Sequence, residues 1–328
     1  MAKSIEKIII IGSGNWGLAL ASVFSNCVPT KVWTIDSAMA EHINSNRENP
    51  GEFFKYPLPK SIIVEKKYGS SFDENQTLFI FAVPSSQIGV VAKELSEHSK
   101  SPLILSVSKG FDARHQCTMS QLIKHYIPKA VVIILTGPTI ANEIAEGKLT
   151  RAVMASDDLM YLALVKEALQ NDQIFFEISR NPIHHEVCAA LKGLVAIAIG
   201  MADGLNLGAN IQGVLMSEGI RELDAVSSFF GINENIALGT SGAGDLIATC
   251  ISQDSRNRKL GNAMAEGLSL EDALKKVQMT VEGIAMSKTI ETLWSLDVSI
   301  PLFHMVNGIL LGRKKDIYAE ICTIIKSL

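Results

Sequence analysis

The chain has 328 residues, of which 47% are hydrophobic and 20% are charged, and its formal net charge is −4. This length exceeds what one ordinary hydrophobic core needs and suits two domains. A slightly acidic chain lacks the broad basic face of nucleic-acid-binding proteins, so we expect no nucleic-acid partner.

The cysteines and the N-terminus indicate a cytoplasmic protein. Five cysteines stand at positions 27, 117, 188, 250 and 322, and no Cys-x-x-Cys pair occurs. An odd, scattered set argues for reduced thiols and against disulfides or a zinc knuckle. The apolar run at residues 8–11 is too short for the core of a signal peptide.

Short β-branched runs alternate with helical patterns in the first half of the chain. Continuous apolar strands joined by amphipathic crossovers, such as residues 18–26 and 88–98, indicate an α/β fold with a doubly wound parallel sheet. We predict strands at residues 8–11, 31–35, 77–83, 103–106, 131–135, 152–155 and 174–178.

The segment Ser179-Arg180-Asn181-Pro182 interrupts this pattern, so we place a domain boundary there. Residues 1–182 would form the α/β domain and residues 183–328 an all-α domain. The longest apolar stretch, residues 187–201, falls short of a membrane span and carries a lysine, which favours a buried helix. Further helices are predicted at residues 184–201, 210–229, 270–277, 286–296 and 300–311.

A glycine-rich turn, Gly12-Ser13-Gly14-Asn15-Trp16-Gly17, follows the first predicted strand and opens a helix. Gly12 would permit the tight turn, Gly14 would let a pyrophosphate approach the backbone, and Gly17 would let the helix pack closely. The free N–H groups of the helix start favour the anion. The turn therefore predicts a Rossmann-type dinucleotide-binding domain.

Asp36 stands near the predicted end of the second strand. An acid there would accept hydrogen bonds from a ribose 2′-hydroxyl and repel a 2′-phosphate. A surface loop residue explains the position equally well. No arginine stands beside Asp36, so the sequence leaves the choice between NAD and NADP open.

Lys192 is the one charged residue between Glu186 and Asp203, in a helix rich in small apolar residues. It either extends to the surface at the edge of the apolar face or is buried for a functional reason. Burial would lower its pKa and suit it to proton exchange near neutral pH.

Two later segments offer groups for an anionic substrate. Thr240–Leu246 is a glycine-rich turn with the carboxylate of Asp245, and Ser255-Arg256-Asn257-Arg258 offers a hydroxyl, an amide and forked guanidinium groups. That set suits a phosphate. A helix N-cap at Ser255 followed by solvated arginines is the alternative interpretation.

The turns at residues 108–110 and 137–139 each follow a predicted strand, at the sheet edge where α/β proteins bind ligands. A surface lysine and an ordinary Gly-Pro turn are the alternatives. The His184-His185-Glu186 run has no third ligand at a fitting spacing. We therefore expect no metal, and we interpret this run as a solvated helix start.

In order and spacing, these segments resemble bacterial NAD(P)-dependent glycerol-3-phosphate dehydrogenase, from residue 8 to residue 312. The resemblance implies a Rossmann domain followed by a helical domain similar to that of 6-phosphogluconate dehydrogenase. The segments that carry it are Gly12–Ala21, Val83-Pro84, Ser108-Lys109-Gly110, Gly137-Pro138-Thr139, Leu191-Lys192, Gly242–Asp245, Ser255–Arg258 and Val281-Glu282-Gly283.

The resemblance implies roles for matching positions. Lys192 matches the proton acceptor of glycerol phosphate oxidation. The positions lining the glycerol phosphate site match Lys109, Gly137, Thr139, Lys192, Asp245, Ser255, Arg256 and Asn257. Those beside the NAD or NADP cofactor match Asn15, Trp16, Lys109, Ala141, Arg256, Thr280 and Glu282, together with Gly12, Gly14 and Gly17 of the turn.

One departure is chemically important, because the family usually has asparagine where this chain has Gly193. The expected reaction interconverts sn-glycerol 3-phosphate and dihydroxyacetone phosphate and supplies phospholipid synthesis. Rival hypotheses are another dehydrogenase of this two-domain plan, acting on 6-phosphogluconate or a 3-hydroxyacid, and a nucleotide-binding sensor without catalysis. The apolar helical half is compatible with a homodimer.

Overall fold

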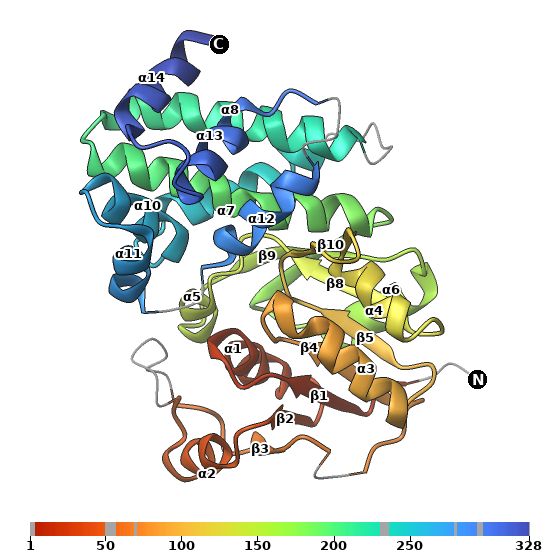
Figure 1. The fold of residues 1–328 in the computed structure, drawn as a ribbon. Helices are drawn as coiled ribbons and strands as arrows, with labels where there is room; N and C mark the ends of the chain where they lie inside the picture. The colour runs from red at the N-terminus through yellow and green to blue at the C-terminus, as the bar shows by residue number, and fades with distance from the viewer. Residues whose placement is uncertain are drawn as a thin grey trace. The chain divides into compact units, whose positions relative to one another are not determined.

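The computed structural model describes residues 4–49, 57–68, 71–229, 236–278, 281–293 and 298–327. The chain divides into two compact units. Unit 1 comprises Met1–Ser108 and Met119–Pro182, and unit 2 comprises Lys109–Thr118 and Ile183–Leu328 (Figure 1). The short segment Lys109–Thr118 therefore belongs with the helices of the second half. A single boundary at residue 182, as the sequence predicted, does not describe this arrangement.

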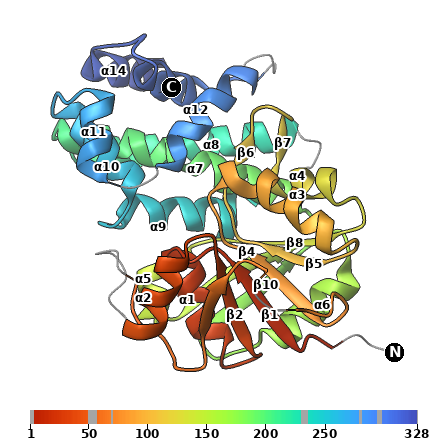
Figure 2. The same ribbon diagram turned by 60° about the horizontal axis from the view of Figure 1, so that its bottom comes forward.

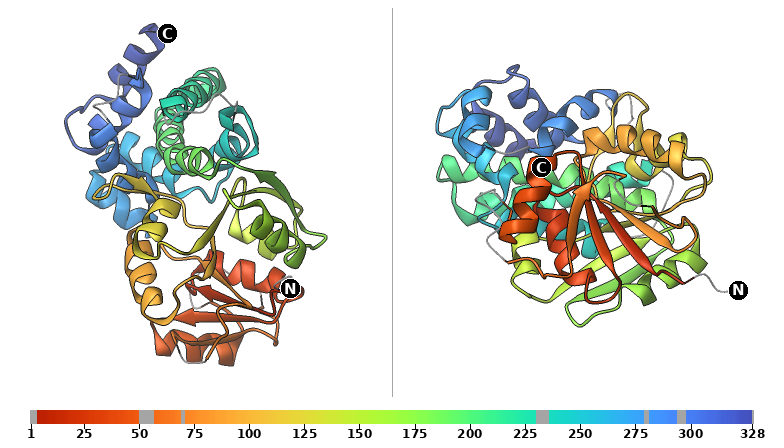
Figure 3. Two further views of the ribbon diagram at one scale, coloured as in Figure 1. Left: turned by 90° about the vertical axis from the view of Figure 1, so that its right-hand side faces the viewer. Right: turned by 90° about the horizontal axis from the view of Figure 1, so that it is seen from below.

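The described residues of unit 1 form an eight-stranded sheet in the order β10-β9-β8-β5-β4-β1-β2-β3, seen as a twisted fan in Figure 3. In this sheet the strands β3, β2, β1, β4, β5 and β8 are all parallel. Strand β9 is antiparallel to β8, and β10 is parallel to β9. The predicted α/β class is confirmed. The strands are β1 (Lys7–Ile11), β2 (Thr30–Thr34), β3 (Ile63–Lys66), β4 (Thr77–Phe81), β5 (Leu103–Ser106), β8 (Val131–Thr136), β9 (Thr150–Ala155) and β10 (Ile174–Ser179).

Helices cover both faces of this sheet because alternate side chains of each strand point to opposite faces. Ile8 and Ile10 of β1 pack into one core with residues of α1, α5 and α6. Figure 2 shows α3 and α4 on the opposite side of the sheet. The helices are α1 (Asn15–Phe24), α2 (Ser37–Asn46), α3 (Ile88–His98), α4 (Met119–Tyr126), α5 (Ala141–Ala145) and α6 (Leu159–Ala168), with the short 3₁₀ turn η1 (Ser85–Gln87) before α3.

Among the residues of unit 2 that the structure describes, the regular elements are helical apart from the hairpin β6 (Phe111–Asp112) and β7 (Cys117–Thr118). Its two longest helices, α7 (Pro182–Gly204) and α8 (Gly208–Phe229), run side by side in Figures 1 and 3. The other elements are η2 (Ile236–Leu238), η3 (Thr240–Gly244), α9 (Asp245–Ile251), α10 (Arg256–Ala265), α11 (Leu270–Val277), α12 (Glu282–Leu293), α13 (Pro301–Leu310) and α14 (Ile317–Ser327).

Helix α7 is the central element of unit 2. It is the one described helix that is long and apolar enough to cross a membrane, but 89% of its most apolar window is buried inside the structure. Burial of this kind is typical of the core helix of a folded domain. Residues from Val187 to Ala202 supply much of the apolar core, as the sequence predicted for a buried helix.

Two glycines let α10 lie directly against α7. A Cβ atom on Gly200 would lie 2.0 Å from the Arg258 carbonyl oxygen, and one on Gly261 would lie 2.0 Å from the Ile197 carbonyl oxygen. Any side chain at either position would therefore collide with the backbone of the other helix. This close crossing sets the start of α10, which carries Arg256 and Asn257, relative to the lysine of α7.

Candidate functional site

The glycine-rich turn of unit 1 has the geometry of a dinucleotide cradle. Gly12 has a φ of +120°, which a residue with a side chain rarely adopts. A Cβ atom on Gly17 would lie 2.1 Å from the Gly12 carbonyl oxygen, so α1 packs directly on the turn. Gly14 caps α1 without a side-chain hydrogen bond, and a Cβ atom there would meet nothing within 4 Å. Open space before a helix N-terminus fits a pyrophosphate.

Neighbouring side chains shape this turn. The Asn15 amide oxygen accepts a hydrogen bond from Asn49 at 2.7 Å, and Trp16 is half-buried against the core of unit 1. Asp36 is exposed and caps α2, because its carboxylate accepts a hydrogen bond from the Met39 backbone N–H at 3.1 Å. The acid expected after β2 is therefore present and also stabilises a helix start.

Gly137, Thr139 and Ala141 follow strand β8 at the same carboxyl edge of the sheet as the glycine-rich turn after β1. Gly137 has a φ of +123°, and the Thr139 hydroxyl donates to the Gly137 carbonyl at 3.0 Å. Ala141 is the first residue of α5. The edge at which open α/β sheets bind ligands therefore holds all these predicted residues.

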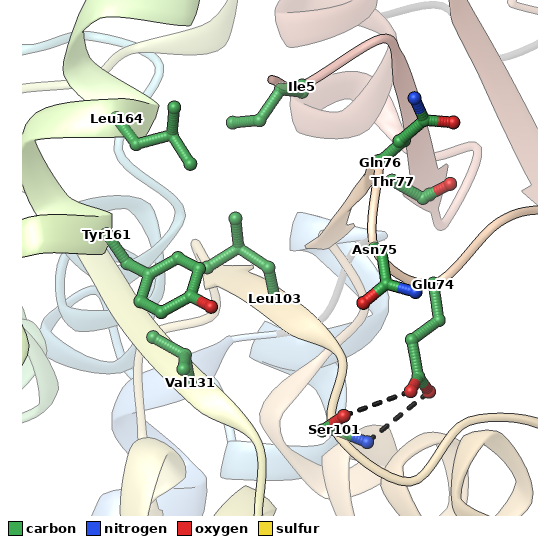
Figure 4. Close-up of a pocket in the computed structure, with 10 residues that line it drawn as sticks. All are labelled: Ile5, Glu74, Asn75, Gln76, Thr77, Ser101, Leu103, Val131, Tyr161 and Leu164. Atoms are coloured by element: carbon green, nitrogen blue, oxygen red, sulfur yellow. Dashed lines mark hydrogen bonds between the residues drawn. The ribbon is translucent and has the colours of Figure 1, made fainter. Parts of the chain in front are cut away.

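A pocket shown in Figure 4 lies at the opposite edge of this sheet. Thr77, Leu103 and Val131, the first residues of β4, β5 and β8, line it. Its Glu74 carboxylate accepts a hydrogen bond from the Ser101 hydroxyl at 3.0 Å. The pocket contains none of the predicted site residues.

In unit 2 the carboxylate of Asp245 joins two lysines. Its Oδ1 accepts a hydrogen bond from Lys192, and its Oδ2 accepts one from Lys109 at 3.0 Å. All three side chains are largely removed from water, with 11% of Lys192, 15% of Lys109 and 2% of Asp245 exposed. The structure thus brings together three predicted residues that lie far apart in the sequence, with one negative charge between two positive ones.

This environment tunes Lys192. Burial, together with the repulsion of Lys109, lowers the pKa of Lys192 to about 8, although the charge of Asp245 opposes this fall. The pKa would be lower still without the carboxylate. Lys192 therefore gains and loses its proton close to neutral pH, as a general acid–base group must. The alternative of a lysine extended into solvent does not hold.

Thr249 is a member of this cluster that our sequence interpretation missed. Its hydroxyl accepts a hydrogen bond from the Lys192 ammonium at 3.0 Å and donates one to the Asp245 carbonyl at 2.7 Å. Asp245 and Thr249 lie four residues apart on α9, a spacing that places two side chains on one helix face. That spacing is the sequence signal that could have identified Thr249 as a neighbour of Asp245.

The Ser255–Arg258 segment forms the start of α10. Ser255 is the N-cap of α10 and accepts a hydrogen bond from the Arg258 backbone N–H at 3.3 Å, so the N-cap of the alternative interpretation is confirmed, whereas the arginines after it are half-buried rather than solvated. Arg258 forms an ion pair with Asp203 of α7. Arg256, the first residue of α10, is half-buried.

Asn257 also has a structural contact. Its Oδ1 accepts a hydrogen bond from the Gly283 backbone N–H at 3.1 Å, which ties α10 to the start of α12. A Cβ atom on Gly193 would lie 3.2 Å from the Asn257 Nδ2 atom, so the missing side chain at position 193 leaves room for this amide. Glu282 begins α12 and is half-buried, whereas Thr280 lies outside the described residues.

The interpretation of His184-His185-Glu186 as a solvated helix start is wrong. These three residues are 1%, 5% and 5% exposed, so this first turn of α7 is buried rather than solvated. His185 instead contacts Ser241. Among the described residues, no group of three or more histidine, cysteine or acidic residues could hold a metal ion.

Family models match both halves of the chain. One described as the N-terminus of NAD-dependent glycerol-3-phosphate dehydrogenase matches residues 7–162, and one described as its C-terminus matches residues 181–319. The chain belongs to the NAD-dependent glycerol-3-phosphate dehydrogenase family. The predicted resemblance is therefore confirmed.

Individual relatives agree with this assignment. The glycerol-3-phosphate dehydrogenase [NAD(P)+] of Fusobacterium nucleatum is 33% identical over 94% of this chain and 93% of its own length. That of Pseudomonas aeruginosa is 32% identical over 93% of this chain and 90% of its own. The glycerol-3-phosphate dehydrogenase structure from Coxiella burnetii has a TM-score of 0.91 and 25% identity, and covers 98% of both chains.

Proposed function

We propose that this enzyme interconverts sn-glycerol 3-phosphate and dihydroxyacetone phosphate with NAD or NADP. The observation that carries the proposal is the Asp245 carboxylate held between Lys192 and Lys109, in a chain that also has an open glycine cradle. Dihydroxyacetone phosphate, NAD(P)H and one proton yield glycerol 3-phosphate and NAD(P)⁺. The relatives named above carry the name of this activity.

The nicotinamide cofactor supplies or accepts the hydride when it is bound. Lys192 carries the proton. As an ammonium it donates to the oxygen at C2 of the substrate during reduction, and as an amine it removes that proton during oxidation. Asp245 and Thr249 orient the Lys192 amine, because each binds it through an oxygen atom.

The phosphate group would bind at the start of α10. Arg256 offers a forked guanidinium that matches two phosphate oxygens, and the helix N-terminus adds a favourable dipole. Ser255 and Asn257 stand beside it, and Asn257 would contribute its amide N–H groups because its oxygen already accepts from Gly283. Lys109, Gly137 and Thr139 complete the proposed substrate set.

The dinucleotide would bind at the cradle of Gly12, Gly14 and Gly17. Its remaining proposed contacts are Asn15, Trp16, Lys109, Ala141, Arg256, Thr280 and Glu282. Residues 1–182, apart from the segment Lys109–Thr118, would serve as the nucleotide domain, and residues 183–328 with that segment would serve as the helical substrate domain. We further propose a cytoplasmic enzyme that supplies phospholipid synthesis and forms a homodimer.

The test is the oxidation of NADH and of NADPH by the purified enzyme with dihydroxyacetone phosphate. The rate is measured as the loss of nicotinamide absorbance. Phosphate-free dihydroxyacetone is the control, because it keeps the carbonyl and lacks the anion. We expect turnover that depends on the phosphate, and the ratio of the two cofactor rates reports the influence of Asp36. Absence of turnover in protein that binds both cofactors would overturn the proposal.

A further inference from the structure

A second polar contact joins the same two elements as the Lys192–Asp245 pair. The Nδ1 atom of His185 in α7 lies 2.5 Å from the Ser241 hydroxyl oxygen in η3, within hydrogen-bond distance. Both side chains are buried, with 5% of His185 and 1% of Ser241 exposed. Buried polar groups are costly unless they are paired, so this contact holds its two elements together.

The contact is aligned with the site. His185 and Lys192 lie seven residues apart on α7, which is two helical turns, so both point to the same face. On the partner elements, Ser241 precedes Asp245 by four residues, and Asp245 precedes Thr249 by four. The His185–Ser241 contact and the Lys192 contacts therefore form successive rungs between α7 and the η3–α9 segment.

The segment between the two rungs is unusual backbone. Thr240–Gly244 is a π-helical turn, in which the Asp245 N–H donates to the Thr240 carbonyl five residues earlier. A Cβ atom on Gly242 would lie 2.2 Å from the Ala237 carbonyl oxygen, so the turn packs directly against η2. Such turns are rare and are often found at functional sites. Here the wide turn ends at the residue that binds both lysines.

We propose that His185 and Ser241 form a latch that holds the π-helical turn and thereby positions the Asp245 carboxylate between Lys192 and Lys109. Both are positioning residues, because neither contacts the reacting atoms. The proposal rests on the proposed function, in which Lys192 exchanges the substrate proton. A loosened latch would let Asp245 withdraw from Lys192 and would weaken the attraction that stabilises the ammonium.

Three variants test the latch. Ser241→Ala removes the hydroxyl. His185→Asn places an amide where the Nδ1 atom of the ring lies, whereas His185→Gln places it near Nε2, so only the asparagine variant keeps a partner for Ser241. The matched control is Ser227→Ala, which removes the buried hydroxyl that lies 3.4 Å from Cys188 Sγ, between α7 and α8.

The first readout is the apparent pKa of Lys192 in the whole enzyme, from the pH dependence of its acetylation rate by acetic anhydride, followed by peptide mass spectrometry. We expect Ser241→Ala and His185→Gln to lower it by about half a unit or more, because Asp245 no longer holds the ammonium as closely. His185→Asn and Ser227→Ala should keep the value of the unmodified sequence. Equal shifts in Ser241→Ala and Ser227→Ala, or none in Ser241→Ala, would overturn the latch.

The second readout is kcat with saturating dihydroxyacetone phosphate. Ser241→Ala should lower kcat roughly tenfold with little change in KM, because misplacement of a catalytic group affects the chemical step. A rise in KM alone would contradict the latch. If the unmodified enzyme does not turn over this substrate, the proposed function fails, while the acetylation experiment still decides the latch.

Discussion

Lys192 of α7 and Asp245 of α9 form an ion pair inside unit 2, and Asp245 also binds Lys109. Two cations sharing one buried anion leave a net positive charge in a site of low dielectric constant. The developing alkoxide of carbonyl reduction and the substrate phosphate are both anionic, so the net positive charge of the site stabilises them. The positive charge of Lys109 also promotes release of the proton from Lys192.

Turnover should depend on the protonation of Lys192, whose pKa is lowered to about 8. Carbonyl reduction uses the ammonium, so its kcat should fall as the pH rises through about 8. Alcohol oxidation uses the amine and should rise over the same range. Initial rates in both directions across the pH range measure this. Parallel pH profiles in the two directions would contradict the proposed proton transfer.

Lys192→Ala should lower kcat by roughly 10²–10⁴-fold, because it removes the general acid. NADH binding, measured by fluorescence titration, should stay near that of the unmodified enzyme. The matched control is Lys259→Ala, which removes an exposed lysine of α10 and should leave kcat unchanged. Near-normal turnover of Lys192→Ala would assign the proton to another group.

Two alanine substitutions in the glycine-rich turn should separate binding from folding. Gly14→Ala has open space for its Cβ atom, so the melting temperature should be preserved while NADH affinity falls, since the methyl group would occupy the cradle. Gly17→Ala places a Cβ atom 2.1 Å from the Gly12 carbonyl oxygen and should destabilise unit 1. Thermal melting with NADH titration distinguishes them, and unchanged NADH affinity in Gly14→Ala would remove the cradle assignment.

The two arginines of α10 should behave differently. Arg256→Ala should raise KM for dihydroxyacetone phosphate by about tenfold or more, because a charge-assisted contact to the phosphate is lost. Arg258→Ala should instead lower the melting temperature, because Asp203 of α7 loses its ion-pair partner. Steady-state kinetics and thermal melting of both variants test this. An unchanged KM in Arg256→Ala would show that the phosphate binds elsewhere.

Glu222 should make stability pH-dependent. It is fully buried in α8, and its carboxylate oxygens lie 2.6 and 2.8 Å from the backbone N–H nitrogens of Leu302 and Phe303 at the start of α13. Burial raises the pKa of Glu222 from 4.5 to about 8. The folded state therefore binds more protons, and this contribution is present below pH 4.5 and lost as the pH rises through about 8.

Thermal melting of Glu222→Gln across this pH range checks the expectation. The decline in melting temperature between mildly acidic and mildly alkaline pH should be smaller in the variant than in the unmodified chain. Glu271→Gln, in which an exposed partner of Lys275 is neutralised, is the control and should keep the original slope. Equal slopes in all three proteins would show that Glu222 does not carry the effect.

Local sequence patterns were sufficient to predict most of the strands of unit 1. Continuous β-branched runs such as residues 103–106 are recognisable because parallel strands are buried on both faces. The edge strand β3 (Ile63–Lys66) was missed because it has four residues, of which the last two are charged, and so lacks a continuous apolar run. The reversal of β9 was also missed, since strand direction leaves no mark on a short apolar run.

The sequence by itself determined the glycine cradle, the doubly wound sheet, the buried α7 and the identity of Lys192 as an unusual lysine, because each rests on local spacing and periodicity. Only the tertiary structure decided that Asp245 binds both lysines, that Lys109–Thr118 belongs with unit 2, and that His185 is buried against Ser241. Those facts depend on packing between segments far apart in the chain, about which local spacing carries no information.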